Sequence, residues 1–119
     1  MARTPSTLGD LESAVMQIVW DSADPLSAYQ ILDLMPEREL APTTVLTVLG
    51  RLERKGLVRT DRAARPHRYR AVASRAEHRA ELMHQVLGDG ADRQAVLERF
   101  VGGVTADDRA ALRRLLGNG

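Results

Sequence analysis

The sequence contains no cysteine and few aromatic residues: one tryptophan, one phenylalanine and two tyrosines. The lack of cysteine excludes a disulfide framework and a cysteine-based zinc or copper site. Because aromatic residues make up only 3% of the chain, the core must be aliphatic. No apolar run approaches the roughly 18 residues of a membrane span, and residues 1–7 are too polar and short for a signal peptide. The sequence therefore predicts a soluble, cytoplasmic protein, with one domain or one small domain and an appendage.

Recognisable enzyme sites are also missing. The three histidines are His67, His78 and His84, and the last two are six residues apart, a spacing that does not place them on one helical face. The segment Gly88-Asp89-Gly90 is too short for a phosphate-binding loop and lacks the Lys-Ser/Thr pair that follows such loops. The acidic residues show no paired-carboxylate pattern. We interpret the chain as a non-enzyme that uses no cofactor and no metal ion.

What the sequence does have is an uneven distribution of charge. The formal net charge is only +1, but residues 1–40 carry −5, residues 41–72 carry +6 and residues 73–119 carry zero. Positive charge packed into one block of a chain is typical of a contact with nucleic acid. The block 41–72 is therefore the first place to look for a function.

The segment from Ala41 to Gly56 has the features of a helix with a defined beginning and end. Pro42 suits the first turn, where its missing N–H has no intrahelical partner, and Gly56 suits the left-handed position after the last turn. At 100° per residue, one face is apolar and consists of Val45, Val48, Leu49 and Leu52. The other face holds small hydroxyls and guanidinium groups and no acid: Thr43, Thr47, Gly50, Arg51 and Arg54, with Thr44 at its edge. Such a face suits the major groove of DNA, although an ordinary solvated helix would show the same pattern.

The flanking segments complete a winged helix-turn-helix. Helical periodicity predicts helices over residues 8–22 and Ala28–Met35, with Ser27 as the N-cap of the second. After Gly56 the period changes, and Leu57–Asp61 and Arg68–Val72 are predicted as two strands of a hairpin, the wing. Three helices and a small hairpin define a mainly α fold, which we assign to residues 1–73. The hairpin region sets five arginines against Asp61: Arg59, Arg62, Arg65, Arg68 and Arg70. Binding of a polyanion would relieve their repulsion.

The remaining residues, 74–119, are predicted to form a helical dimerisation region. Three short helices are expected, over Arg75–Leu87, Arg93–Val101 and Ala106–Leu116. Gly102-Gly103 would end the second, and Thr105 would cap the third. The apolar residues are too few to enclose a core, so we expect this region to pair with a second copy of the chain. The expected dimerisation residues are Met83, Val86, Leu87, Val96, Phe100, Val101, Leu112, Leu115 and Leu116.

The expected DNA-binding residues come from the 41–56 helix and the wing. Those on the helix are Thr43, Thr44, Leu46, Thr47, Arg51 and Arg54. Those in the wing are Arg62, Arg65, His67 and Arg68. The helix residues would lie in the major groove, and the wing residues would contact phosphates or the edge of the minor groove.

Several short motifs form a recognisable set. They are Leu8-Gly9-Asp10-Leu11-Glu12 followed by Val15-Met16 and Trp20, Thr44-Val45-Leu46-Thr47-Val48-Leu49 with Arg51-Leu52, Lys55-Gly56-Leu57-Val58, His67-Arg68-Tyr69, and Phe100-Val101. This set resembles the penicillinase-repressor family of BlaI/MecI-type regulators, from about residue 8 to residue 116. The resemblance implies a homodimeric repressor bound to palindromic operators in double-stranded DNA, with β-lactamase or other resistance and stress genes under its control. It also implies release from DNA when a membrane sensor metalloprotease triggers cleavage in the dimerisation region.

The chain departs from the patterns of this family at three places. A copper-responsive branch carries a C-terminal Cys-x-Cys metal site, which a chain without cysteine cannot form. In the penicillinase branch the cleaved bond joins Asn to Phe, whereas the matching pair here is Arg99-Phe100. Leu46 stands where a polar residue is common on the reading helix, so a different base preference is expected.

Two other functions fit the same predicted fold. A winged-helix module that binds protein would not explain the concentration of positive charge in residues 41–72. A small-molecule-responsive regulator of another winged-helix family usually needs a ligand pocket between long helices, and the short C-terminal helices leave little room for one.

Overall fold

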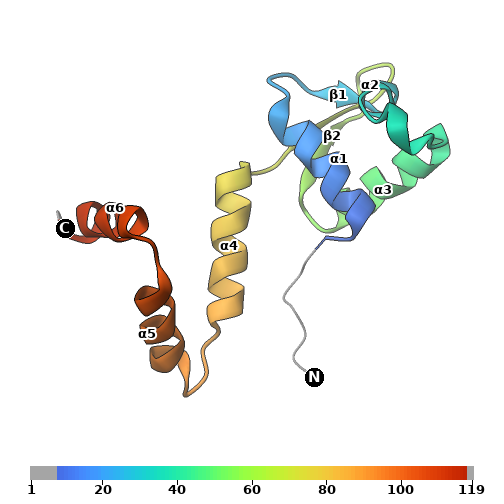
Figure 1. Cartoon of the computed structure of the whole chain (residues 1–119). Coiled ribbons are helices and arrows are strands. Elements are labelled where there is room, and N and C mark those ends of the chain that lie inside the picture. The colour runs from blue at the N-terminus through green and yellow to red at the C-terminus, as the bar shows by residue number, and fades with distance from the viewer. Residues whose placement is uncertain (1–7, 118–119) are drawn as a thin grey trace. The chain divides into compact units, whose positions relative to one another are not determined.

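The computed structural model describes residues 8–117, which form mainly helices with one small sheet (Figure 1). These residues divide into two compact units between Leu82 and Met83, within one helix. The elements in chain order are α1 (Asp10–Asp21), β1 (Leu26–Ser27), α2 (Ala28–Asp33), the 3₁₀ turn η1 (Pro36–Arg38), α3 (Pro42–Arg54), β2 (Val58–Asp61), β3 (Arg68–Ala71), α4 (Arg75–Leu87), α5 (Arg93–Gly103) and α6 (Ala106–Gly117). The predicted order of three helices, a hairpin and three further helices is confirmed.

The first unit encloses an aliphatic core between its three helices and the sheet. The largest fully enclosed side chains include Met16 of α1, Ile31 of α2 and Leu49 of α3, so all three helices share this core. The whole predicted apolar face of α3 is buried: Val45, Val48, Leu49 and Leu52. Burial of one such side chain contributes about 1.5–3 kcal/mol. The core therefore holds α3 by one face and leaves its other face free.

The sheet has the order β1-β3-β2, and both pairs of strands are antiparallel. Side chains alternate along the hairpin: Val58 and Tyr69 are buried, whereas Arg59, Arg68 and Arg70 are exposed. Strand β1 was not predicted. A strand of two residues is too short to show an alternating pattern, and its partner β3 lies far along the chain.

The connection between α2 and α3 differs from the prediction. Ser27 caps α2 as expected, because its Oγ accepts the N–H of Gln30 at 3.2 Å. The helix, however, ends at Asp33 and not at Met35, which is buried in the turn that follows. Pro36 disfavours helical backbone at the residue before it and starts η1.

The beginning and the end of α3 match the prediction closely. Pro42 is the first helical residue, and Gly56 has the left-handed φ of 78° that glycine adopts without strain. Behind Gly56, the N–H of Leu57 donates to the carbonyl of Leu52 at 2.9 Å and closes the helix. The chain can therefore turn directly from α3 into β2.

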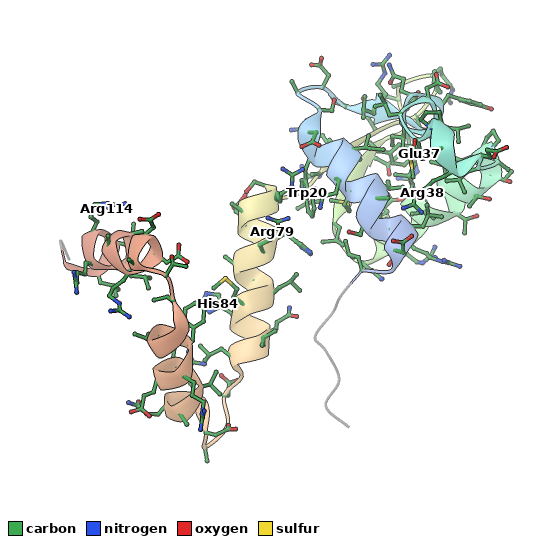
Figure 2. All side chains as sticks on the ribbon, viewed as in Figure 1. Trp20, Glu37, Arg38, Arg79, His84 and Arg114 are labelled. Atoms are coloured by element: carbon green, nitrogen blue, oxygen red, sulfur yellow. The ribbon has the colours of Figure 1, made fainter. Side chains whose placement is uncertain are left out.

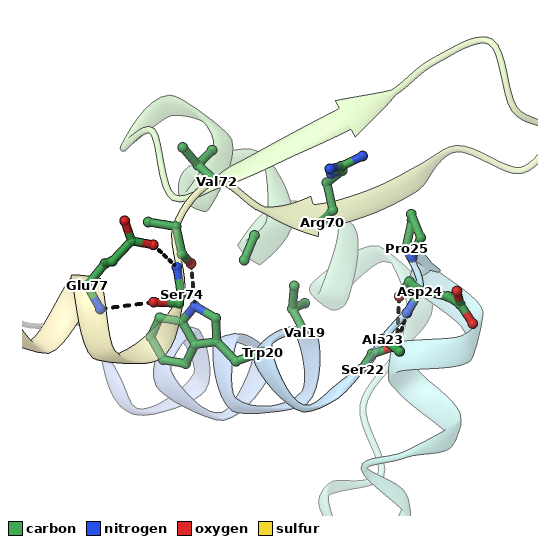
Figure 3. A pocket seen from close by; sticks show the side chains of 12 residues that line it. Val19, Trp20, Ser22, Ala23, Asp24, Pro25, Arg70, Val72, Ser74 and Glu77 are labelled. Carbon is green, nitrogen blue, oxygen red and sulfur yellow. Dashed lines mark hydrogen bonds between the residues drawn. The ribbon is translucent and has the colours of Figure 1, made fainter.

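The beginning of α4 belongs to the first unit and packs against Trp20 of α1 (Figure 3). The indole N–H of Trp20 donates to the carbonyl of Ala73 at 3.0 Å, and Arg75 pairs with Asp21 at 2.6 Å. The imidazole ring of His78 lies 5.3 Å from the indole ring of Trp20. The first unit thus extends beyond residue 73, where the sequence predicts the end of the winged-helix domain.

The second unit has no core of its own among the residues that the structure describes. None of the side chains of α4, α5 and α6 is buried, and those of α5 and α6 stand out from the helices (Figure 2). The expectation that these helices enclose no core is confirmed. The helix α5 ends at the predicted glycine pair but two residues later than Val101: both glycines belong to α5, and the backbone becomes extended at Val104. Thr105 caps α6 as predicted, because its Oγ1 accepts the N–H of Asp108 at 3.1 Å.

No helix within residues 8–117 has the length and apolarity that crossing a membrane requires.

Candidate nucleic-acid interface

The outer face of α3 carries the helix residues that the sequence predicts to contact DNA. Five of them are exposed, Thr43, Leu46 (at 45%), Thr47, Arg51 and Arg54, while Thr44 is half-buried at the edge. The hydroxyl of Thr47 donates to the carbonyl of Thr43 at 2.9 Å. Thr47 therefore has its oxygen lone pairs and its methyl group available for a base, but not its hydroxyl proton.

The structure separates the basic residues of the block 41–72 into two groups. Lys55 forms a salt bridge with Glu12, and Arg62 forms one with Glu53. The other six have no salt bridge to any carboxylate of residues 8–117: Arg51, Arg54, Arg59, Arg65, Arg68 and Arg70. Guanidinium groups without an intramolecular counter-ion are available to an external anion.

The wing residues lie in the loop between β2 and β3 and at the start of β3. Arg65 is exposed, and its Nη1 donates to the carbonyl of Arg62 at 2.8 Å, so the guanidinium group is held against the loop. His67 is half-buried, and Arg68 is exposed at the start of β3, directly opposite Asp61. The structure thus presents Arg65 and Arg68 to solvent without a salt bridge to a carboxylate of residues 8–117.

Two further arginines of the hairpin also lack a salt bridge to residues 8–117. Arg59 and Arg70 are opposite each other in the β2–β3 register and both are exposed. Arg70 lines a pocket of about 360 Å³ together with Trp20, Asp24 and Glu77 (Figure 3). None of the residues that line this pocket comes from α3 or from the loop 62–67. This pocket therefore does not connect Arg70 with the outer face of α3.

The sequence predicts no acid on the exposed side of α3, but Glu53 lies at the edge of that side and is partly exposed. Both carboxylate oxygens of Glu53 accept hydrogen bonds from Arg62, at 2.8 and 2.9 Å. This guanidinium group lowers the pKa of Glu53, and the carboxylate in turn raises the pKa of Arg62. The pair joins α3 to the root of the wing, and because it depends on how the hairpin folds back, no local pattern in the sequence predicts it.

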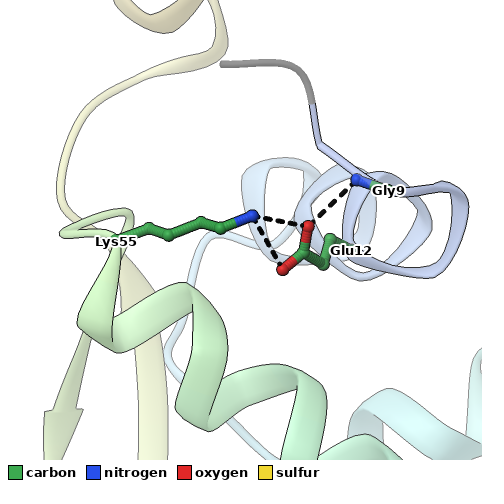
Figure 4. Close-up of polar contacts among 3 residues, drawn as sticks. All are labelled: Gly9, Glu12 and Lys55. Atoms are coloured by element: carbon green, nitrogen blue, oxygen red, sulfur yellow. Dashed lines mark hydrogen bonds and ion pairs between the residues drawn. The ribbon is translucent and has the colours of Figure 1, made fainter.

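A second ion pair fixes the end of α3 (Figure 4). The ammonium group of Lys55, the residue that caps α3, contacts both carboxylate oxygens of Glu12 near the start of α1. The hydrogen bond from Lys55, followed by that from the backbone N–H of Gly9, lowers the pKa of Glu12. Lys55 is thereby committed to the fold and is not part of the free positive charge.

The predicted dimerisation residues lie on α4, α5 and α6, exposed or half-buried. Leu115 and Leu116 are the most exposed, at 77%, and Phe100 is 51% exposed. Val101, Leu112 and Leu116 line an open, mainly apolar groove of about 550 Å³ formed by α5 and α6. Arg99 and Phe100, the predicted cleavage pair, lie inside α5 and are both exposed.

Potential metal ligands do not gather anywhere in the described part of the chain: no three His, Asp or Glu side chains lie close enough to hold an ion.

Three helices, a hairpin and unpaired arginines on the outer face of the third helix define the class of winged helix-turn-helix DNA-binding proteins.

Residues 8–118 match the Penicillinase repressor family. The transcriptional regulator BlaI of Mycobacterium tuberculosis, from strains CDC 1551 / Oshkosh and H37Rv, is 47% identical over 113 residues, which cover 92% of this chain and 82% of that protein. An uncharacterised 16.5 kDa protein of Latilactobacillus sakei is 32% identical over 78 residues, 65% of this chain and 53% of that protein. The chain belongs to the penicillinase repressor family and is a transcriptional regulator of the BlaI type, not an enzyme. The family resemblance drawn from the sequence is confirmed.

A solved structure supports the same fold. A MarR family protein from Bacillus stearothermophilus superposes with a TM-score of 0.53 over 97% of this chain and 74% of that chain. At 19% sequence identity, this similarity concerns the fold alone. The predicted winged-helix fold class is confirmed.

Proposed function

We propose that this regulator represses transcription as a homodimer that binds palindromic operators in double-stranded DNA. The observation that carries the proposal is the group of arginines without a carboxylate partner on α3 and the wing loop. A solvated surface usually mixes the two signs of charge, whereas a surface that binds DNA leaves cations free for phosphates and base edges. A regulator that binds chromosomal DNA would act in the cytoplasm.

The residues of the interface divide by chemistry. Thr43, Thr44, Thr47 and Arg51 would lie along base edges in the major groove, where Arg recognises guanine and a Thr methyl group contacts the methyl group of thymine. Leu46, apolar and 45% exposed on the same helix, suits a thymine methyl group in the same way. Arg54, Arg65, His67 and Arg68 would contact phosphates, whereas Arg62, also expected there from the sequence, is paired with Glu53.

The dimer rests on the second unit. The end of α4, together with α5 and α6, exposes large apolar side chains by more than half, among them Met83, Val86 and Phe100. Burial of these surfaces against a second copy would remove them from water, and a two-fold pair is the commonest way to do so. The two reading helices would then bind half-sites about one turn of DNA apart.

For release we propose cleavage at Arg99-Phe100, triggered by a membrane sensor metalloprotease, with β-lactamase or other resistance and stress genes as targets. Cutting α5 would separate the two winged-helix domains of the dimer. Each domain would then bind its half-site alone and would lose the gain in affinity that linkage provides, roughly 10²–10⁴-fold. Since the bond lies within a helix, α5 must open locally before a protease can bind it. Release by another signal without cleavage is the alternative.

The proposed DNA binding is tested by a gel shift with the promoter upstream of the protein's own gene, repeated over a series of salt concentrations. A scrambled duplex of equal length is the control. We expect a discrete complex with the promoter whose affinity falls steeply with salt. Equal binding to both duplexes would contradict the operator, and no binding to either at low salt would favour a winged-helix module that binds protein.

A further inference from the structure

The root of the wing is tied to α3 by a two-pronged ion pair. Nη1 of Arg62 lies 2.9 Å from one carboxylate oxygen of Glu53, and Nη2 lies 2.8 Å from the other. The two planar groups match each other fully, which is the strongest geometry that an arginine and a carboxylate can adopt. The Glu53 side chain is 31% exposed and that of Arg62 is 62% exposed, so the pair stands at the surface next to the proposed DNA interface.

The neighbouring arginines of the wing are held differently. Arg65 donates only to carbonyl oxygens of its own loop, at 2.8 and 3.4 Å, so these contacts do not neutralise its charge with a carboxylate. Arg68 is exposed without a carboxylate partner in the described chain. A phosphate can approach either of them at little cost. To reach Arg62 in the same way, a phosphate would have to displace Glu53 from two hydrogen bonds and would meet the repulsion of its carboxylate.

We infer that Glu53 withholds Arg62 from the phosphates of DNA and so limits the affinity of the regulator for DNA of any sequence. The inference rests on the proposed DNA-binding function. Glu53 acts as a positioning residue: it contacts no base, but it removes one cation from the phosphate-binding surface. Since phosphate contacts carry no sequence information, the withheld contact would otherwise strengthen binding to non-operator DNA as well as to the operator.

The test measures the slope of log affinity against log salt for the full chain on a duplex of arbitrary sequence. Glu53→Gln keeps the shape of the side chain and frees Arg62, so the slope should steepen by about 0.9, the value of one phosphate contact. If this gain vanishes near 1 M salt, binding at 0.1 M should be about eightfold tighter. The double variant Glu53→Gln/Arg62→Gln has the wild-type net charge and should return to the wild-type slope.

Two control variants show how the slope responds when an acid or an arginine is neutralised elsewhere. Asp24→Asn removes an exposed acid, with no salt bridge, in the turn after α1 and should leave the slope unchanged. Arg65→Gln should flatten the slope by about 0.9. Circular dichroism checks that each variant is folded, which is expected for substitutions at the surface.

Two outcomes overturn the inference while the proposed function stands. One is an unchanged slope in Glu53→Gln beside a flattened slope in Arg65→Gln. The other is a double variant whose slope is flatter than the wild-type slope by as much as that of Arg65→Gln, since Arg62 would then already bind phosphate. If the wild-type protein shows no salt-dependent binding to DNA, the proposed function and the inference fall together.

Discussion

The ammonium group of Lys55 lies 2.8 and 3.0 Å from the two carboxylate oxygens of Glu12 (Figure 4). The same carboxylate accepts the backbone N–H of Gly9 at 2.9 Å, at the start of α1. The Glu12 side chain is only 10% exposed, whereas that of Lys55 is 45% exposed. This contact joins the first turn of α1 to the end of α3, the proposed reading helix, and thereby helps to hold the two helices in position relative to each other.

The Glu12–Lys55 pair should make stability depend on pH. These bonds lower the pKa of Glu12 in the folded state below its usual 4.5. The pair therefore stabilises the fold above about pH 4.5, and its contribution is lost as the pH falls through the lower, folded pKa. Glu12→Gln should cost about 1 kcal/mol at pH 7 in urea unfolding, and less towards pH 4. Glu37→Gln, at an exposed acid of η1, is the control, and an equal loss from both variants at every pH would contradict the role of the pair.

The reading face of α3 can be tested by base substitution in the operator. If Arg51 recognises a base, Arg51→Ala should lose about 1–3 kcal/mol of discrimination at one operator position. If Arg51 contacts only phosphate, the loss should be similar on all sequences. Thr47→Ala tests the neighbouring turn, and Arg79→Ala, on the exposed side of α4, matches the change in charge. Binding that is unaltered by both Arg51→Ala and Thr47→Ala would place the reading face elsewhere.

The extent of the winged-helix domain can be tested by truncation. A fragment 1–82 should fold and bind a single half-site weakly, because it keeps the contacts of Trp20 and Asp21 with the start of α4. A fragment 1–73 lacks Arg75 and His78 and should melt at a lower temperature. The fluorescence of Trp20, the single tryptophan, reports directly on its contact with the start of α4, and its emission should shift to the red in the shorter fragment. Identical melting and emission of the two fragments would mean that α4 adds nothing to the domain.

The proposed dimer should dissociate when a charge is placed on its apolar surface. Phe100→Asp or Leu112→Asp would bury an unpaired carboxylate in the interface. Sedimentation at micromolar concentration should show a dimer for the wild type and a monomer for either variant. Gln94→Asp introduces the same charge at another exposed position of α5 and should leave the dimer intact. A monomeric wild-type protein would contradict the proposal.

Proteolytic release can be followed by immunoblot of the protein in its native host before and after exposure to a β-lactam. We expect a shorter band that ends near Arg99-Phe100. Stiffening α5 with Gly102→Ala and Gly103→Ala should slow cleavage, because each alanine favours helix by up to about 1 kcal/mol and meets no atom within 4 Å. A full-length band throughout, with the target genes switched on, would show that release needs no cleavage.

The sequence by itself determined the features whose signals are local. The buried face of α3 follows from the spacing of Val45, Val48, Leu49 and Leu52, and its end follows from the conformational freedom of Gly56. The lack of buried residues in α4, α5 and α6 also follows from composition, since short helices with few apolar side chains cannot enclose a core. Each of these signals depends on residues within a few positions of one another.

Only the tertiary structure decided which charges remain free. Pairing with Glu12 and Glu53 removes Lys55 and Arg62 from the positive block, and the acids lie 43 and 9 positions earlier in the chain. Likewise, β1 exists because the fold brings Leu26 beside Tyr69, and α4 begins on the first unit because Trp20 reaches Ala73. A salt bridge or a strand pair depends on the position of its partner in space, and the folding of the whole unit sets that position.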